Sequence, residues 1–401
     1  MIAETTVRTV NDMTARWARA AVVEEGTALA AAGLWPLLAL LAGPAAGPAR
    51  EELADALGID AEYAVREGCA LLDALTKADG VDAAVSLWTQ RTLELHAPWL
   101  RSLPLDAHGT LTGDADADAR AMDEWVRRRT DGLIDKMPGP GGAGTLLRLA
   151  SALLVRTTWH RPFDDFPWEA TEGPWAGRRM TGLRRSGGDP ERIRVHTTPD
   201  GALTSAEVAG DNGLDVHLLL GPPAMPGGEV LRHGVAALGG AYPTLSGTEL
   251  ADGAGPGVDV RTVTSWDRRP LASLTCVGFT VEADHDLLKR AELFGLASAT
   301  DTSRGHFPGI SPQPLAVSSA RQAVTATFGP QGFRAAAATS IDLQLGSALR
   351  PQERAQLVSA VFDRPFGFLA VHRESGLVLV AGWVTDPDGW TERPPWIGEV
   401  W

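Results

Sequence analysis

The chain is 401 residues long, with 44% apolar and 21% charged residues, which is typical of a folded globular protein and excludes a disordered or collagen-like one. Its 50 acidic and 36 basic residues give a formal net charge of −14, which opposes contact with nucleic acid and with anionic membranes, so we expect neither as a partner. The two cysteines, Cys69 and Cys276, are too few for a disulfide framework.

A stretch without charges, residues 26–49, is long enough to span a bilayer. Pro36 lies near its centre and glycines interrupt it, while the acidic pair Glu24 and Glu25 precedes it where a signal sequence needs positive charge. We therefore predict a buried core helix followed by a turn, and a cytoplasmic protein.

Helical patterns dominate the first 140 residues, and strand patterns dominate the rest. The predicted helices lie at 50–57, 63–77 and 119–129, and the predicted strands at 215–220, 274–281, 323–328, 366–371 and 376–384. The last strand is apolar at nearly every position, as expected for a central strand that is covered on both faces. No linker, charge block or repeat divides the chain, so we predict one α+β domain over residues 1–401.

Motifs of enzymes and metal sites are absent or lack their required context. Residues 139–144 spell Gly-x-Gly-x-x-Gly, but no strand precedes them, so we interpret them as a turn. Residues 114–118 resemble the start of a calcium loop, but Ala119 and Trp125 stand where that loop needs Gly and Glu, which favours a solvated helix start. We expect no enzyme, no cofactor and no metal. A hydrolase with a dispersed Ser-His-Asp set is the remote alternative.

Residues 332–351 have the most informative pattern in the chain. Apolar or small residues alternate with others over thirteen positions, the first set being Phe333, Ala335, Ala337, Thr339, Ile341, Leu343 and Leu345. A strand with this pattern lays one face on a core and leaves the other in water. Two interpretations remain open at this point, namely an ordinary long central strand and a mobile loop that becomes a strand.

Five motifs, spread in order along the chain, resemble one known family. The first is Trp35-Pro36 with the helix at 50–58, and the second is the pattern Asp-x-Trp-Val-x-x-x-Thr-x-Gly-x-Ile at residues 123–134. The third, at residues 153–163, contains Trp159 and Pro162-Phe163, and the fourth, at residues 332–339, is a Gly followed by an alanine run and Thr. The fifth, at residues 362–387, is a predicted hairpin that begins at Asp-Arg-Pro-Phe and ends at Trp-Val-Thr-Asp-Pro. Together they resemble the serpins, protease inhibitors that insert a reactive-centre loop into their own central sheet.

The resemblance implies an α+β serpin fold with three sheets, about nine helices and an exposed reactive-centre loop at about 332–361. It implies a suicide-substrate inhibitor of serine proteases, in which cleavage of the loop gives an acyl-enzyme that is trapped when the loop inserts as a strand. We expect a monomer whose partner is a subtilisin- or chymotrypsin-like protease. The alternative is a non-inhibitory serpin that acts as a binding or carrier module. Family habit makes an extracellular location the alternative to the cytoplasm.

The resemblance also assigns site residues. The hinge is Gly332, Phe333, Arg334, Ala335, Ala336, Ala337, Ala338 and Thr339, and the scissile bond is expected among Leu345, Gly346, Ser347 and Leu349. The region under the opening sheet is assigned to Trp35, Leu38, Ser151, Trp159 and Gln322.

Several residues depart from the family pattern. Around the hinge, Phe333 stands where the family has a small residue, Arg334 stands in place of an acid, and Pro330 stands where the family often has Glu. Under the sheet, Trp35 and Leu38 replace the usual pair of Ser residues, Ser151 replaces an Asn and Gln322 replaces a His. We expect Phe333 to need extra space on insertion, and overpacking typically costs ~1–3 kcal/mol. These departures bear on the rate and control of insertion.

Overall fold

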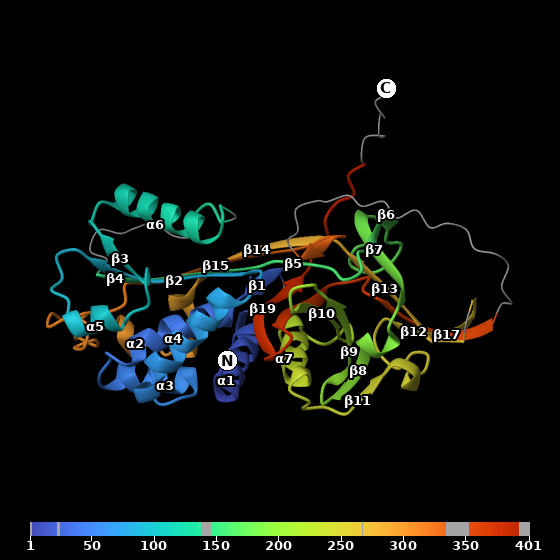
Figure 1. Ribbon diagram of the computed structural model, residues 1–401, viewed down its shortest axis with the longest axis horizontal. Helices are drawn as coiled ribbons and strands as arrows, with labels where there is room; N and C mark the ends of the chain where they lie inside the picture. Colours follow the sequence, from blue (N-terminus) through green and yellow to red (C-terminus); the bar gives the residue numbers. More distant parts are fainter. Residues whose placement is uncertain are drawn as a thin grey trace, which may run out of the picture.

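Three β-sheets form the framework of the computed structural model, which describes residues 2–21, 25–132, 134–137, 146–266, 268–333 and 353–392 (Figure 1). Within these residues the α-helices are α1 (Glu4–Ala21), α2 (Ala31–Ala42), α3 (Pro48–Leu57), α4 (Ala61–Lys77), α5 (Ala97–Ser102), α6 (Ala115–Arg129) and α7 (Gly227–Leu238). Short 3-10 helices add η1 (Pro190–Arg192), η2 (Gly247–Glu249), η3 (Leu287–Phe294) and η4 (Ser298–Thr300).

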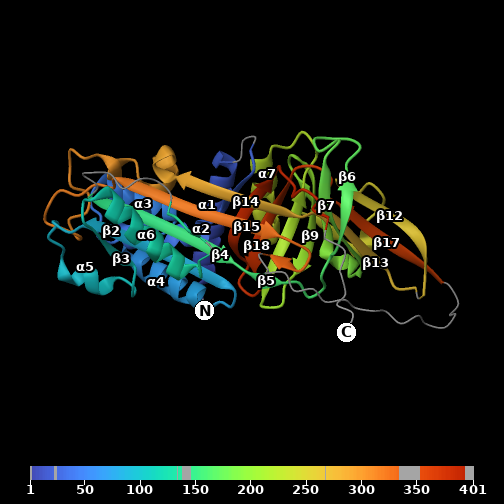
Figure 2. The same cartoon turned by 90° about the horizontal axis from the view of Figure 1, so that it is seen from above.

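The sheet that we call the long sheet has seven strands. In spatial order six of them are β3 (His108–Leu111), β2 (Val81–Gln90), β4 (Leu147–Val155), β15 (Ser319–Phe328), β16 (Gly332–Phe333) and β5 (Thr157–Thr158), and β14 (Phe279–Asp286) pairs with β15 along its other edge. Helix α6 lies over one face of this sheet, and α2, α3 and α4 lie on the opposite side (Figures 1 and 2). The centre of the long sheet is therefore covered on both faces.

The second sheet, which we call the core sheet, also has seven strands. Their order is β1 (Thr27–Leu29), β19 (Leu377–Val384), β18 (Phe366–His372), β10 (Leu214–Leu220), β9 (Gly201–Ala209), β8 (Ile193–Thr198) and β11 (Thr244–Ser246). Every residue of β18 and β19 is buried except for one partly exposed residue in each strand. The sequence prediction of a central, doubly covered strand at 376–384 is confirmed.

The third sheet, which we call the edge sheet, has five strands. Their order is β12 (Val258–Ser265), β17 (Glu353–Val361), β13 (Leu271–Val277), β7 (Arg179–Gly188) and β6 (Asp164–Glu169). Strand β17 corrects one expectation, because the exposed loop was predicted to continue to about residue 361. Residues 353–361 instead pair with β12 on one side and with β13 on the other.

Two further expectations need correction. A single strand was predicted at 274–281, but Gly278 separates β13 of the edge sheet from β14 of the long sheet, and the chain changes sheets at that glycine. The helix start at residue 114 is confirmed, since Asp114 caps α6 by accepting from the amide of Ala117. Asp118 is not solvated as predicted, because it is buried and accepts from the backbone amides of Thr112 and Gly113.

The charge-free stretch at 26–49 contains α2, in which every residue is buried against the surrounding helices and sheets. This confirms the prediction of a core helix. Among the described residues, no helix is long and apolar enough to cross a membrane. The Gly-x-Gly-x-x-Gly turn at 139–144 lies outside the described residues.

Candidate functional site

The hinge expected from the sequence begins inside the long sheet. The chain leaves β15 at Phe328, turns through residues 329–331 and returns as β16, antiparallel to β15, with Phe333 opposite Phe328. On its other side β16 pairs with β5, where Phe333 is opposite Thr157. The first two hinge residues are therefore already a strand of this sheet. The remaining hinge residues, 334–339, and the candidate scissile residues lie outside the described residues.

The side chain of Phe333 is 1% exposed and packs 5.9 Å from the ring of Phe368, measured between ring centroids. Its partner Phe328 stacks on Phe279 at 5.4 Å with an interplanar angle of 17°. The fold thus provides an apolar site for a large hinge residue before any further insertion. The expectation that Phe333 would need extra space on insertion is wrong, because that space is already built and filled.

Three backbone or side-chain donors hold the turn that precedes β16. The amide of Trp159 donates to the carbonyl of Gln331 at 2.9 Å, and its indole Nε1 donates to the carbonyl of Gly329 at 2.9 Å. The amide of Phe163 donates to the carbonyl of Pro330 at 2.8 Å. We call Trp159, Phe163 and residues 329–331 the hinge clamp. Proline suits position 330 because this turn uses its carbonyl and needs no amide from it.

Trp159 therefore belongs to the hinge clamp and not to the region under the sheet, where the sequence had placed it. Its ring lies 4.8 Å from that of Phe328, and Phe163 lies 5.7 Å from the same ring. Trp159 follows Ser151 by eight residues, which corresponds to roughly 26 Å of extended chain at ~3.3 Å per residue. The two residues therefore lie far apart along the strand direction of the long sheet.

Gln322 and Ser151 are brought together under the long sheet, as predicted. The side-chain amide of Gln322 donates to the carbonyl of Ala30 at 3.0 Å and to Ser151 Oγ at 3.3 Å, and its Oε1 accepts from the amide of Ala30 at 3.0 Å. Gln322 and Ser151 are both fully buried. A Cβ at Gly33 would lie 3.1 Å from Ser151 Oγ, so a glycine lets α2 approach β4 here.

Trp35 and Leu38 are buried, but Trp35 directs its polar atom elsewhere. Its indole Nε1 donates to the carbonyl of Leu57 at the end of α3, at 3.1 Å. Residue 35 lies about 200° round the helix from Gly33, which faces Ser151, because each residue turns an α-helix by about 100°. Leu38 is part of the apolar core. Trp35 thus joins α2 to α3 rather than extending the Gln322 cluster.

The long sheet forks above this cluster. Strands β4 and β15 pair directly and in parallel, from Arg148 with Ser319 up to Leu153 with Val324. Beyond that point β16 lies between β15 and β5, and β5 follows β4 after one residue. Parallel pairs are slightly less stable per residue than antiparallel ones. The sheet therefore has a direct parallel pair at its centre and a short antiparallel strand already placed in the fork above it.

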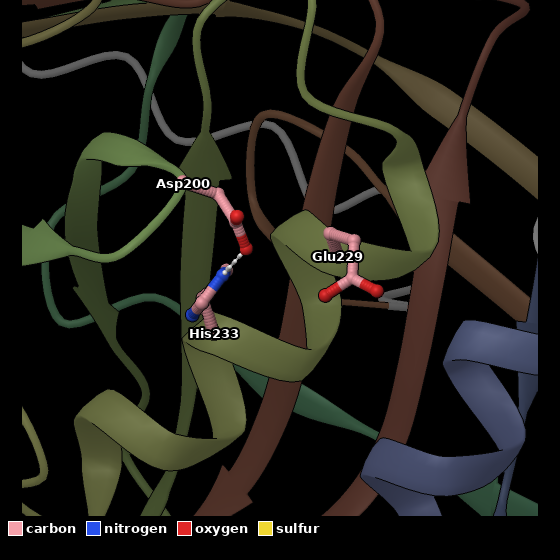
Figure 3. Close-up of side chains that lie close together, drawn as sticks. All are labelled: Asp200, Glu229 and His233. Carbon is pink, nitrogen blue, oxygen red and sulfur yellow. Dashed lines mark hydrogen bonds and ion pairs between the residues drawn. The ribbon is translucent and has the colours of Figure 1, made fainter.

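Among the described residues one group of three side chains has the composition of a metal site, namely Asp200, Glu229 and His233 (Figure 3). His233 Nε2 lies 2.7 Å from Asp200 Oδ2, and its Nδ1 lies 2.7 Å from the hydroxyl of Tyr242. Arg232 contacts both carboxylates, and Arg19 forms a second ion pair with Glu229 at 2.9 Å. The hydrogen bond from His233 lowers the pKa of Asp200. Two cations already balance the two carboxylates, so the group joins α7 to its neighbours and opposes a further cation.

Comparison with known proteins places this geometry in a family. The family model described as Serpin (serine protease inhibitor) matches residues 9–171 and 262–387. The chain belongs to the serpin family. One similar serpin is bovine plasminogen activator inhibitor 1, which is 24% identical over 324 residues, or 77% of this chain and 72% of that protein. Another is mouse glia-derived nexin, which is 25% identical over 283 residues, or 68% of this chain and 64% of that protein. A putative rice serpin-Z6C is 29% identical over 282 residues, 67% of this chain but only 64% of the length of that relative.

Solved serpins confirm the fold. The native thermophilic serpin tengpin matches with a TM-score of 0.75 at 14% identity, over 96% of this chain and 95% of that one. Native protease nexin-1 with heparin matches with a TM-score of 0.71 at 15% identity, over 96% of this chain and 100% of that one. Thyroxine-binding globulin with thyroxine matches with a TM-score of 0.71 at 14% identity, over 96% of this chain and 99% of that one. The predicted α+β serpin fold with three sheets is therefore confirmed.

Proposed function

We propose that this serpin is a suicide-substrate inhibitor of serine proteases whose cleaved loop inserts between β4 and β15. The observation that carries the proposal is β16, which already lies in the fork of the long sheet and points toward the direct β4–β15 pair. The name of one relative, plasminogen activator inhibitor 1, states an inhibitory activity and supports the same function.

The registers of the three pairings agree with insertion. If the chain continued β16 without a bulge, residue 342 would lie opposite Ser319 on β15 and Arg148 on β4, by extension of the pairs at Phe333. Ser319 and Arg148 are direct partners in the present sheet. A strand could therefore enter by moving β4 and β15 apart sideways, by about 4.8 Å, without either strand sliding along its axis.

The orientation of the side chains on β15 and β16 is also consistent with insertion. Along β15 the even-numbered residues are buried, and Phe333 lies opposite Phe328 on that buried face. Continued insertion would turn Ala335, Ala337, Thr339 and Ile341 toward the core, because side chains alternate along a strand. Thr339 would then lie opposite Gln322 and Ser151, where its hydroxyl could replace the hydrogen bond between those two side chains. The inserted strand thus meets the buried polar cluster with its one inward hydroxyl in this stretch.

The chemistry needs only a cleavable loop and a conformational step. The protease serine attacks the scissile carbonyl, the peptide C–N bond breaks, the new amine leaves with a proton, and an ester joins the protease to the loop. We place that carbonyl among Leu345, Gly346, Ser347 and Leu349, which suits a subtilisin- or chymotrypsin-like protease with an apolar pocket. We further propose that one monomer traps one protease.

The experiment that tests the proposal is incubation of the protein with subtilisin, chymotrypsin, elastase and trypsin, followed by electrophoresis in SDS after boiling. An inhibitor gives a band at the summed mass with at least one of these proteases, because the ester bond survives denaturation. Mass spectrometry of that band identifies the scissile residue. Cleavage of the loop by all four proteases without any covalent band would overturn the proposal in favour of the non-inhibitory binding or carrier module.

A further inference from the structure

A cavity of about 260 Å³ lies between the edge sheet and the core sheet. Strands β7 and β13 form one wall, η1 with β8 and β9 form the other, and residues 160–161 after β5 border it. Figures 1 and 2 show β7 and β13 beside β9 at this end of the molecule. The cavity adjoins the hinge clamp, because its lining residue Arg185 lies over the ring of Phe163, but none of the Gln322 cluster lines it.

Positive charge is concentrated in this cavity. Arg161, Arg185 and Arg192 line it, although the whole chain carries a net charge of −14. Two carboxylates also line it, but each is already engaged. Glu207 is shared between Arg192 and Arg194, and Asp189 caps η1 by accepting from the amide of Glu191 at 3.1 Å. The three arginines outnumber the two carboxylates of the lining by one, and Arg161 and Arg185 are the two arginines without an ion pair to either carboxylate.

Arg185 stands out because its side chain is partly buried and forms no ion pair with a carboxylate of the described residues. Its Nη1 donates to the carbonyl of Arg161 at 3.1 Å, and its guanidinium lies 4.8 Å above the ring of Phe163. Arg161 donates only to the carbonyls of Gly187 and Ser186. Within the described ranges of the chain, neither arginine forms an ion pair with a carboxylate. Burial, reinforced by the positive charge of Arg161, lowers the pKa of Arg185 to about 10.

A cation that is partly withdrawn from water without a counter-ion is less favourable than a paired one. A guanidinium presents its donors in a planar fork that matches the oxygens of a carboxylate or a phosphate. Apolar side chains also line the cavity, namely Ile193, Ala272 and Leu274, and Leu274 is the cross-strand partner of Arg185. The cavity therefore places apolar groups beside the cationic ones.

We propose that this cavity binds a small organic anion, in which a carboxylate or phosphate contacts Arg185 and Arg161 and an apolar group rests on Ile193 and Leu274. The volume accommodates a single ring with its anionic group and excludes a large cofactor. The proposal concerns a binding site only and does not depend on protease inhibition.

Calorimetric titration of the full chain with phenyl phosphate tests the proposal, with phenol and benzylamine as neutral and cationic probes of similar size. We expect phenyl phosphate to bind with a Kd of about 0.1–1 mM and the other two to bind at least about tenfold more weakly. Binding should also raise the melting temperature of the protein, because the ligand stabilises the folded state. No binding of phenyl phosphate up to about 10 mM, or equal binding of phenol, would overturn the proposal.

Two matched variants locate the site. Arg185→Gln should weaken binding of phenyl phosphate at least about tenfold, because it removes the guanidinium that contacts the anion. Arg184→Gln removes the neighbouring arginine, which is exposed and lies over the ring of Phe166 at 4.7 Å, and should leave the Kd within about twofold. If Arg185→Gln fails to fold, Arg161→Gln supplies the same test from the cavity rim. Equal weakening by the Arg184 variant would overturn the assignment, since the effect would then reflect net charge alone.

Discussion

Phe333 lies directly opposite Phe328 across the antiparallel pair of β16 and β15, and both side chains are buried. The turn between them is held by the hinge clamp through the carbonyls of residues 329–331. The first two residues of the predicted hinge are therefore already paired in the long sheet. In the proposed mechanism, further insertion requires separation of β4 from β15 over the six residue pairs between Arg148–Ser319 and Leu153–Val324.

Shortening Phe333 should destabilise this state. Phe333→Ala removes a ring that is 1% exposed and packs near Phe368, and such changes typically cost about 3–5 kcal/mol of unfolding free energy. Phe333→Leu retains most of the apolar volume and should cost less than about 1.5 kcal/mol. Urea unfolding followed by tryptophan fluorescence measures both values. A Phe333→Ala variant as stable as the parent would show that the ring is not buried in the folded protein.

Gln322 should be essential to the centre of the long sheet. Gln322→Ala leaves the buried amide and carbonyl of Ala30 without their side-chain partner, and each orphaned group costs about 1–3 kcal/mol. Ser151→Ala is the matched control, because it removes a single hydrogen bond of 3.3 Å and should cost about 1 kcal/mol or less. Equal losses of unfolding free energy in the two variants would contradict the bridging role of Gln322.

Stability should fall in mild acid because of His196. Its ring lies between Thr244 Oγ1 and Ser205 Oγ, each at 2.8 Å, and burial together with Arg194 lowers its pKa from 6.5 to about 4. The unfolded chain therefore binds a proton first as the pH falls. The associated stability is present above pH 6.5 and is lost toward pH 4, amounting to about 3 kcal/mol.

The melting temperature measured between about pH 7.5 and about pH 4.5 shows whether stability falls with decreasing pH and whether His196 causes the fall. His196→Gln removes the titrating group and should flatten the fall in melting temperature, whereas a His160→Gln control alters an exposed histidine and should not. The same acid dependence in the parent and in His196→Gln would assign the effect to other groups, such as His217, whose pKa burial also lowers.

The register of β16 makes a prediction about two neighbouring alanines. Ala337→Arg would turn a cation toward the core opposite Leu153 and Val324, a cost of several kcal/mol that should block insertion. Ala336→Arg would place the same residue on the opposite face and should be tolerated far better. In the SDS gel the first variant should be cleaved without forming a complex, while the second still forms one. Equal trapping by both variants would show that the inward assignment is wrong.

The sequence predicted much of this arrangement, for reasons that particular residues make clear. Period-two alternation placed Phe333 on the inward face, which is confirmed, because alternation is a property of the strand itself. The sequence could not show that Phe333 was already inserted, since that depends on pairing with β5 and β15, which are distant in the chain. The interval 274–281 looked like one strand because its apolar pattern is continuous across Gly278, where the chain changes sheets.

Grouping of the site residues was the weaker part of the sequence prediction. Ser151 and Gln322 meet as expected, whereas Trp159 lies at the hinge clamp and Trp35 bonds to α3. The resemblance to the family identified which residues to consider, but it did not show how far along a strand, or on which side of a helix, each residue lies. The bridging role of the Ala30 backbone had no signal in the sequence, since any residue carries an amide and a carbonyl.

The most direct test of the account is the melting temperature of the protein before and after a single cut within residues 341–352, made with a trace of a protease that is not trapped. Insertion of the freed strand adds ladder hydrogen bonds on both sides, at about 1 kcal/mol each, and should raise the melting temperature by at least about 10 °C. Protein treated with inactivated protease is the control. A melting temperature that is unchanged or lowered by the cut would contradict the central claim that the loop inserts between β4 and β15.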